Sequence, residues 1–100
     1  DVCSSDLPSE EKFGIISQFR RAAISISLNI SEGAGKNTDV DFCRFLDNAR
    51  GSSFEVENVI FLCFDLNFIN EKTQNEFLLK VTEIQRMLDG LIDKFRKDKK

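Results

Sequence analysis

Residues 42–66 read FCRFLDNARGSSFEVENVIFLCFDL, and the spacing of their apolar side chains decides the fold. Apolar or small residues recur at alternating steps of three and four, the period of one face of an α-helix. The members of this row are Phe42, Phe45, Ala49, Ser52, Val56, Val59, Cys63 and Leu66. A second row beside it consists of Leu46, Ser53 and Ile60. Because Thr38 followed by Asp41 is typical of a helix start, we expect a helix over about 39–67.

The same alternation occurs on both sides of this stretch. The earlier row is Ile16, Phe19, Ala23, Ile26 and Ile30, and the later one is Phe77, Val81, Ile84, Leu88, Leu91 and Phe95. These rows predict helices over about 9–33 and 71–97, with Asn70 capping the last one. Short connections between long helices favour antiparallel neighbours. We therefore expect an all-α protein with an up-down antiparallel bundle.

The chain opens with DVCSSDL, which shows no such pattern. This heptapeptide resembles a translated sequencing-library adapter, so we interpret residues 1–6 as a non-native, adapter-derived tail. The alternative is a genuine polar tail. The adapter interpretation makes residues 7–100 the helical bundle domain and implies that native sequence precedes Leu7.

Composition narrows the class of protein. The chain has 100 residues, enough for one domain, and its net charge of -3 argues against strong, non-specific nucleic-acid binding by the whole surface. No apolar run approaches the roughly 20 residues that span a bilayer, and no signal-peptide pattern occurs. Three cysteines without close pairing argue against a disulfide framework. We expect a cytoplasmic protein without a membrane partner.

The ten phenylalanines, with no tryptophan or tyrosine, need an apolar environment. Phe54, Phe61 and Phe68 lie seven apart and roughly opposite the core row, and Phe64 joins them. A solvent-facing row of phenylalanines suits a monomer poorly. We therefore predict that these four residues form a subunit interface in a homo-oligomer; the alternative is that a lost helix covers them.

Catalytic chemistry has little support in these residues. Histidine is absent, which removes the commonest general base and the commonest zinc ligand. The stretch GAGKNTD (33–39) fails as a phosphate-binding loop, because the pattern needs Gly where Ile30 stands and Ser or Thr where Asn37 stands. We expect no catalytic residue, no metal site, no cofactor and no enzymatic activity.

Basic side chains are the remaining candidates for a binding site. Those that could contact phosphate are Arg20, Arg21, Lys36, Arg44 and Arg50. The simpler interpretation of each is a solvated helix face or a helix-end charge.

The stretches RRAAISISLNISEG (20–33), FCRFLDNARGSSFEVE (42–57) and MLDGLI (87–92) together resemble one family. It is the four-helix-bundle family encoded by intervening sequences of bacterial 23S ribosomal RNA genes. The resemblance runs from about Leu7 to Phe95 and implies that three helices of a four-helix bundle are present, the first being absent upstream. This agrees with the adapter interpretation.

The resemblance also implies a role. Members of the family look like small bundles that assemble into rings, typically pentamers, and a similar accessory protein of diversity-generating retroelements binds a reverse transcriptase and RNA. We therefore expect a non-enzymatic, self-assembling protein linked to 23S rRNA intervening sequences. The alternative is a nucleic-acid-binding accessory subunit that acts with an RNA or a reverse transcriptase, using the five basic residues named above.

Overall fold

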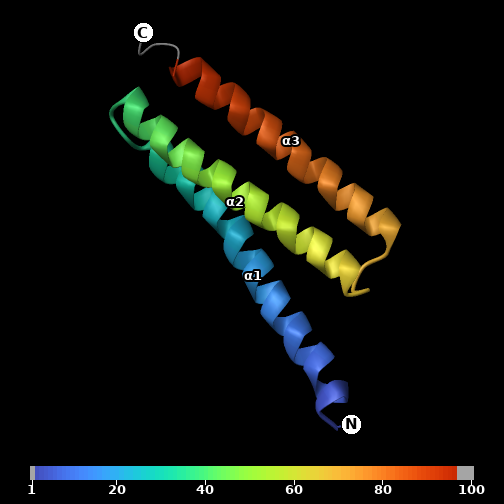
Figure 1. The fold of residues 1–100 in the computed structure, drawn as a ribbon. Helices are drawn as coiled ribbons and strands as arrows, with labels where there is room; N and C mark the ends of the chain where they lie inside the picture. The colour runs from blue at the N-terminus through green and yellow to red at the C-terminus, as the bar shows by residue number, and fades with distance from the viewer. Residues whose placement is uncertain (1, 97–100) are drawn as a thin grey trace.

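The computed structural model describes the backbone of residues 2–96 and the side chains of residues 12–96. It contains three helices, α1 (Val2–Ala34), α2 (Asp39–Asp65) and α3 (Glu71–Arg96). They run alternately up and down, and the molecule is elongated, with extents of 61 × 23 × 16 Å (Figure 1). Over the described residues there is no strand, so the expected all-α, up-down arrangement is confirmed.

The helix bounds differ from expectation mainly at the first helix. It begins at Val2 rather than near residue 9, so the segment 2–6 is helical backbone. Each further residue adds one hydrogen bond to an existing helix, so elongation needs no apolar pattern of its own. The native or adapter origin of this segment is independent of its conformation and stays a prediction. The expected end of the third helix at residue 97 lies outside the described residues.

The caps of α2 and α3 follow the sequence signals. Thr38 is extended, and its Oγ1 accepts a hydrogen bond from the backbone N–H of Asp41 at 3.2 Å. The Oδ1 of Asn70 accepts one from the N–H of Thr73 at 2.8 Å. These contacts satisfy N–H groups that have no partner within their own helix, so both predicted caps are confirmed.

The chain reverses after α2 at Asn67, whose φ of 63° lies in the left-handed region. The N–H of Phe68 donates to the carbonyl of Cys63 at 2.8 Å, and the N–H of Asn67 donates to that of Phe64 at 3.0 Å. This pattern is a Schellman motif with asparagine in place of the usual glycine. It ends the helix sharply, so Phe68 no longer follows the register of α2.

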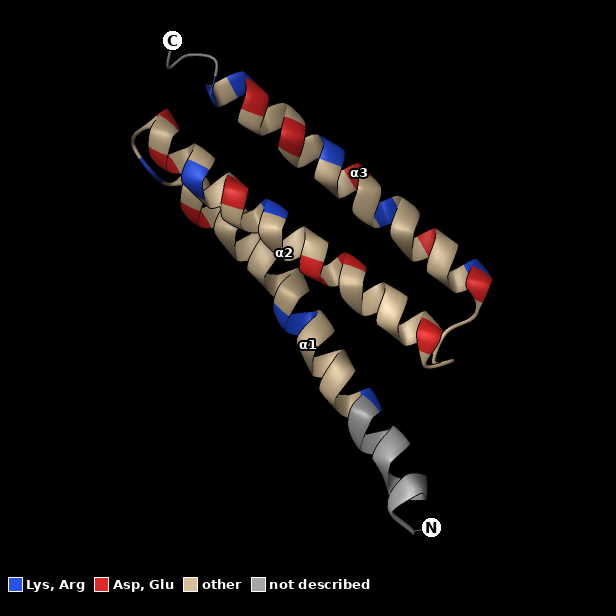
Figure 2. Cartoon of the chain, viewed as in Figure 1, with Lys and Arg blue, Asp and Glu red and all other residues tan. Residues whose placement is uncertain are grey.

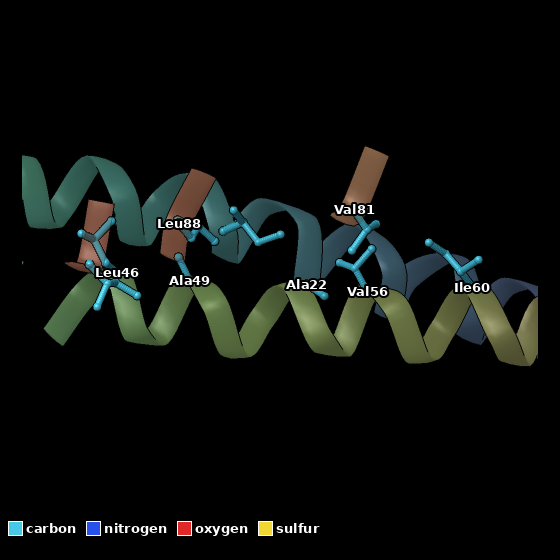
Figure 3. Packing of buried hydrophobic residues seen from close by; sticks show 9 residues of the cluster. Ala22, Leu46, Ala49, Val56, Ile60, Val81 and Leu88 are labelled. Carbon is cyan, nitrogen blue, oxygen red and sulfur yellow. The ribbon is translucent and has the colours of Figure 1, made fainter. Parts of the chain in front are cut away.

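The core lies along α2, the central helix. Both α1 and α3 pack against it, whereas contacts between α1 and α3 are minor. The buried cluster contains Ala22, Ile26, Leu46, Ala49, Val56, Ile60, Val81, Leu88 and Ile92 (Figure 3). Small residues lie along the contact between α1 and α2: Ala22 and Ala49 are buried at different levels of it, and the Oγ atoms of Ser25 and Ser52 are 2.8 Å apart, which lets the two backbones approach closely.

Gly33 shows how tight this approach is. It is buried near the end of α1, and a Cβ atom built on it would lie 2.8 Å from both Cδ1 of Phe42 and Cβ of Phe45. The described glycines have no positive φ. Gly33 is therefore required by the proximity of α2 rather than by a left-handed helix end.

Candidate functional site

An apolar groove runs between α1 and α3, with α2 as its floor. Two adjoining hollows of about 330 and 390 Å³ form it, and they share Phe19, Ile60 and Phe77. The surface that we call the groove comprises Ile16, Phe19, Ala23, Ile60, Phe77 and Ile84. Charged residues in its lining are few, and all of them are basic: Lys12, Arg20 and Lys80.

The groove exists because the apolar stripes of α1 and α3 are wider than their contacts with α2. On α1, Ile15 is buried, whereas its neighbour Ile16 is 38% exposed and lines the groove. On α3, Phe77 and Ile84 belong to the row expected in the core, yet they are 38% and 36% exposed. Each outer helix therefore packs against one partner, although its apolar stripe is wide enough for two.

A second apolar surface lies on α2. Phe54, Phe61 and Leu62 are 43%, 42% and 42% exposed, and we call these three residues the α2 ridge. Of the four residues predicted to form an interface, Phe54 and Phe61 belong to the ridge. Phe64 is half-buried. Phe68 is also half-buried and lines the groove, because the turn at Asn67 precedes it.

Polar contacts with α3 fix the orientation of the ridge. Arg50 Nε lies 2.6 Å from Asp89 Oδ1. Gln85 Nε2 donates to Glu57 Oε1 at 3.1 Å. Phe54 follows Arg50 by four residues and precedes Glu57 by three, so it shares their face of α2, on the flank beside α3.

The candidate phosphate-binding residues do not form one patch. Lys and Arg are spread over the helices and the first loop (Figure 2). Arg20 lines the groove, whereas Arg21 lines a separate shallow hollow on α1. Arg50 pairs with Asp89 and lies 5.3 Å from the ring centre of Phe54.

Only two of the five basic residues are brought together. Lys36 Nζ lies 5.2 Å from the ring centre of Phe45, and Arg44 Cζ lies 4.7 Å from the same point. Arg44 also forms an exposed ion pair with Asp41, with 3.4 Å between Nη2 and Oδ1. These contacts hold two positive charges at the end of the bundle where α1 joins α2.

A polar network joins α1 and α2 in the middle of their contact. The Oγ atoms of Ser25 and Ser52 are 2.8 Å apart. Asn29 Nδ2 donates to the carbonyl of Ser25 at 2.8 Å and to its Oγ at 3.1 Å. The network fixes the register of the two helices, because shifting one of them would separate these partners.

The described part of the chain holds two free cysteines, Cys43 and Cys63. Cys43 is buried, and burial raises the pKa of the half-buried Cys63 thiol, which lines the groove. Within residues 12–96, no three His, Cys, Asp or Glu side chains are placed to hold a metal ion. Over the described helices, no segment is both long and apolar enough to cross a bilayer.

Two basic residues that line the groove, Lys12 and Lys80, were not among the candidates identified from the sequence. Lys12 and Lys80 are far apart in the chain and belong to no motif. Their spacing relative to the apolar rows is the signal that points to them, since Lys12 precedes Ile16 by four residues and Lys80 follows Phe77 by three.

Comparison with known proteins bears on most of the chain. A family model described as 23S rRNA-intervening sequence protein matches residues 2–90. This range includes the first two stretches that carry the resemblance and the beginning of the third, both surfaces described above and most of α3. No curated protein and no solved structure matches the chain significantly.

Proposed function

The chain belongs to the 23S rRNA-intervening sequence protein family, and within it we propose a non-enzymatic, self-assembling protein of the cytoplasm that forms homo-oligomers. The observation that carries this proposal is the α2 ridge. Phe54, Phe61 and Leu62 expose large apolar side chains on one helix; Phe54 and Phe61 share a face, and Leu62 lies about 100° around the helix from Phe61. Exposed apolar surface of this kind is typical of interfaces between subunits.

Burial of the ridge supplies the driving force for assembly. Each buried Phe or Leu side chain contributes roughly 1.5–3 kcal/mol relative to an exposed one. Because the three side chains are already about half covered by their own chain, association gains only part of this. Repetition of the contact around a closed assembly would add such gains, and the ring form expected from the family resemblance provides that repetition.

Sedimentation velocity over a range of protein concentrations tests the proposal. Phe61→Ser should lower the oligomeric order while the helicity measured by circular dichroism is kept. Leu79→Ser is the matched control, because Leu79 is 68% exposed on α3 and lies outside the ridge and the groove. An assembly unchanged by Phe61→Ser, or disrupted equally by Leu79→Ser, would refute the role of the ridge.

The second candidate function is a nucleic-acid-binding accessory subunit that acts with an RNA or a reverse transcriptase. It is favoured by one observation, the placement of Lys36 and Arg44 over the same Phe45 ring. Phosphate contacts would make the affinity fall steeply with added salt. Fluorescence anisotropy of a labelled RNA oligonucleotide, with wild type and the Lys36→Ala/Arg44→Ala variant at several salt concentrations, measures this directly.

A further inference from the structure

A shallow hollow on α1 lies apart from both the groove and the α2 ridge. Its volume is about 380 Å³, and its lining consists of Arg21, Ile24, Ser25, Leu28, Asn29 and Glu32. Ile24 and Leu28 are 56% and 58% exposed, although both are large and apolar. Because they are one helical turn apart, they form a small apolar surface that their own chain leaves open.

This surface faces away from the groove. Arg21 precedes the buried Ala22 by one residue, and Ala23, which lines the groove, follows it by one. At about 100° per residue, Arg21 and Ala23 lie about 200° apart around α1. A helix seated in the groove therefore leaves the hollow uncovered.

Four residues of the hollow form one row along α1. Arg21, Ser25, Leu28 and Glu32 follow one another at steps of four, three and four, which keeps them on one side of the helix. We call these four residues the α1 row. Its two ends carry charges of opposite sign, and its middle holds one small and one large side chain.

The end charges of the α1 row are available to a partner. Arg21 and Glu32 are both exposed, and within residues 12–96 neither of them belongs to an ion pair. They cannot pair with each other, because eleven residues of helix separate them by about 16 Å. A partner helix that presents the opposite order of charges would pair with both.

A second copy of the row presents that order when it runs antiparallel. Reversal places Arg21 of one copy opposite Glu32 of the other at both ends of the contact. It also places Leu28 of one copy over Ser25 of the other, so a large side chain meets a small one. A parallel copy would instead set each end charge against its own like, which disfavours association.

The floor of this contact is held in place before association. Ser25 Oγ lies 2.8 Å from Ser52 Oγ, and Asn29 Nδ2 donates to the carbonyl of Ser25 at 2.8 Å. These bonds fix side chains that a second copy would cover, so binding has less to order. The Ser25 hydroxyl already has a partner, so covering it leaves no unsatisfied group there.

We propose that two copies of this chain pair through the α1 row, antiparallel and about a two-fold axis. The axis passes midway between Arg21 and Glu32, and Ile24 adds apolar surface beside Leu28. The contact is isologous, so it is complete with two copies and leaves no open row for a third. It goes beyond the proposed self-assembly through the α2 ridge, because it uses a different helix and closes by itself.

Sedimentation velocity in a Phe61→Ser background separates this contact from the ridge. With the ridge weakened, we expect a concentration-dependent equilibrium of monomer and dimer. Adding Leu28→Ser should raise the dissociation constant of the dimer on the order of a hundredfold, because each dimer loses two apolar side chains. Leu79→Ser, added instead, is the matched control on α3 and should leave the dimer intact. If Leu28→Ser has no more effect than Leu79→Ser, the pairing is wrong.

A charge swap in the same background tests the antiparallel direction. Arg21→Glu alone, or Glu32→Arg alone, opposes like charges at both ends, and the dissociation constant should rise on the order of tenfold. Both side chains are exposed, so the helicity should be kept. A mixture of the two single variants should form a heterodimer, and Arg21→Glu/Glu32→Arg on one chain should restore the homodimer. If neither restores pairing, the antiparallel contact is refuted.

The outcomes also distinguish this inference from the proposed function. If Phe61→Ser is monomeric at every concentration, assembly through the ridge stands and the pairing through α1 fails. If Phe61→Ser leaves the assembly unchanged while Leu28→Ser reduces it, the role of the ridge fails and the pairing through α1 stands.

Discussion

Replacing Gly33 with alanine should destabilise the protein, although the same change normally stabilises a helix. In an open helix interior, alanine is favoured over glycine by about 1 kcal/mol. At Gly33 the new methyl group would lie 2.8 Å from Cβ of Phe45, an atom fixed to the backbone of α2, and 3.3 Å from the carbonyl oxygen of Phe42. The Phe42 ring can rotate away, but these two atoms cannot. The helices must therefore separate by several tenths of an ångström.

The size of the effect follows from two opposing contributions. Overpacking of a core by one carbon costs roughly 1–3 kcal/mol, and the gain in helix propensity offsets at most about 1 kcal/mol of this. With a mid-range overpacking cost of about 2 kcal/mol and the full offset of about 1 kcal/mol, the net loss should be about 1 kcal/mol. For a domain of 60–100 residues, each kcal/mol lowers the melting temperature by about 4–8 °C.

Gly90→Ala provides the matched control. Gly90 lies within α3, and a Cβ atom added there meets nothing within 4 Å. This variant should gain about 0.5–1 kcal/mol. Urea denaturation followed by circular dichroism, at one fixed protein concentration, compares the two with wild type. If Gly33→Ala is as stable as Gly90→Ala, the close approach of α1 and α2 is refuted.

Three further measurements test other parts of the structure. Leu46→Ala should cost about 2–5 kcal/mol in urea denaturation, because Leu46 is fully buried and its loss leaves a cavity. A double-mutant cycle of Ser25→Ala and Ser52→Ala should give a coupling of about 1 kcal/mol from their hydrogen bond; a coupling near zero would contradict it. Burial raises the pKa of Cys63, so its alkylation by iodoacetamide should begin at higher pH than that of a small-molecule thiol. The stability of the fold should fall as the pH rises, because the Cys63 thiol ionises at lower pH in the unfolded chain than in the folded one.

The helices and their caps could be predicted because their signals are local. The alternation of three and four and the cap residues Thr38 and Asn70 depend on neighbours within a few positions. The same locality explains one failure. The seven-residue spacing of Phe54, Phe61 and Phe68 assumes one continuous helix, but the left-handed Asn67 ends α2 before Phe68. Asparagine tolerates that conformation, so the residue type permits the turn without requiring it.

The choice of buried row could not be read from the periodicity. On α1 the sequence favours Ile16, Phe19 and Ala23, whereas Ile15 and Ala22 are the better buried residues. A wide apolar stripe shows that a helix has partners, but the number and position of those partners decide which residues each one covers. The groove forms only where the three helices pack together, so no single segment of the sequence predicts it.

The scatter of the basic residues has a similar cause. Arg44 and Arg50 lie six residues apart on α2 and have equal charge in the sequence. In the structure, Arg44 stacks over Phe45 near the first loop, and Arg50 pairs with Asp89, a residue 39 positions later. Sequence proximity could predict the pair of Arg44 with Asp41, three residues earlier, but not the pair of Arg50 with Asp89, because an ion pair between helices depends on the packing.

The central place of α2 has a consequence for local opening of the chain. Since α1 and α3 both rest on α2 and scarcely on each other, detaching one of them removes few contacts from the other. Amide hydrogen exchange should therefore show α1 and α3 opening as separate units, with α2 retaining the slowest amides. In such a hierarchy, a ligand that clamps only α3 would slow exchange in α3 and α2 while leaving the rate in α1 nearly unchanged.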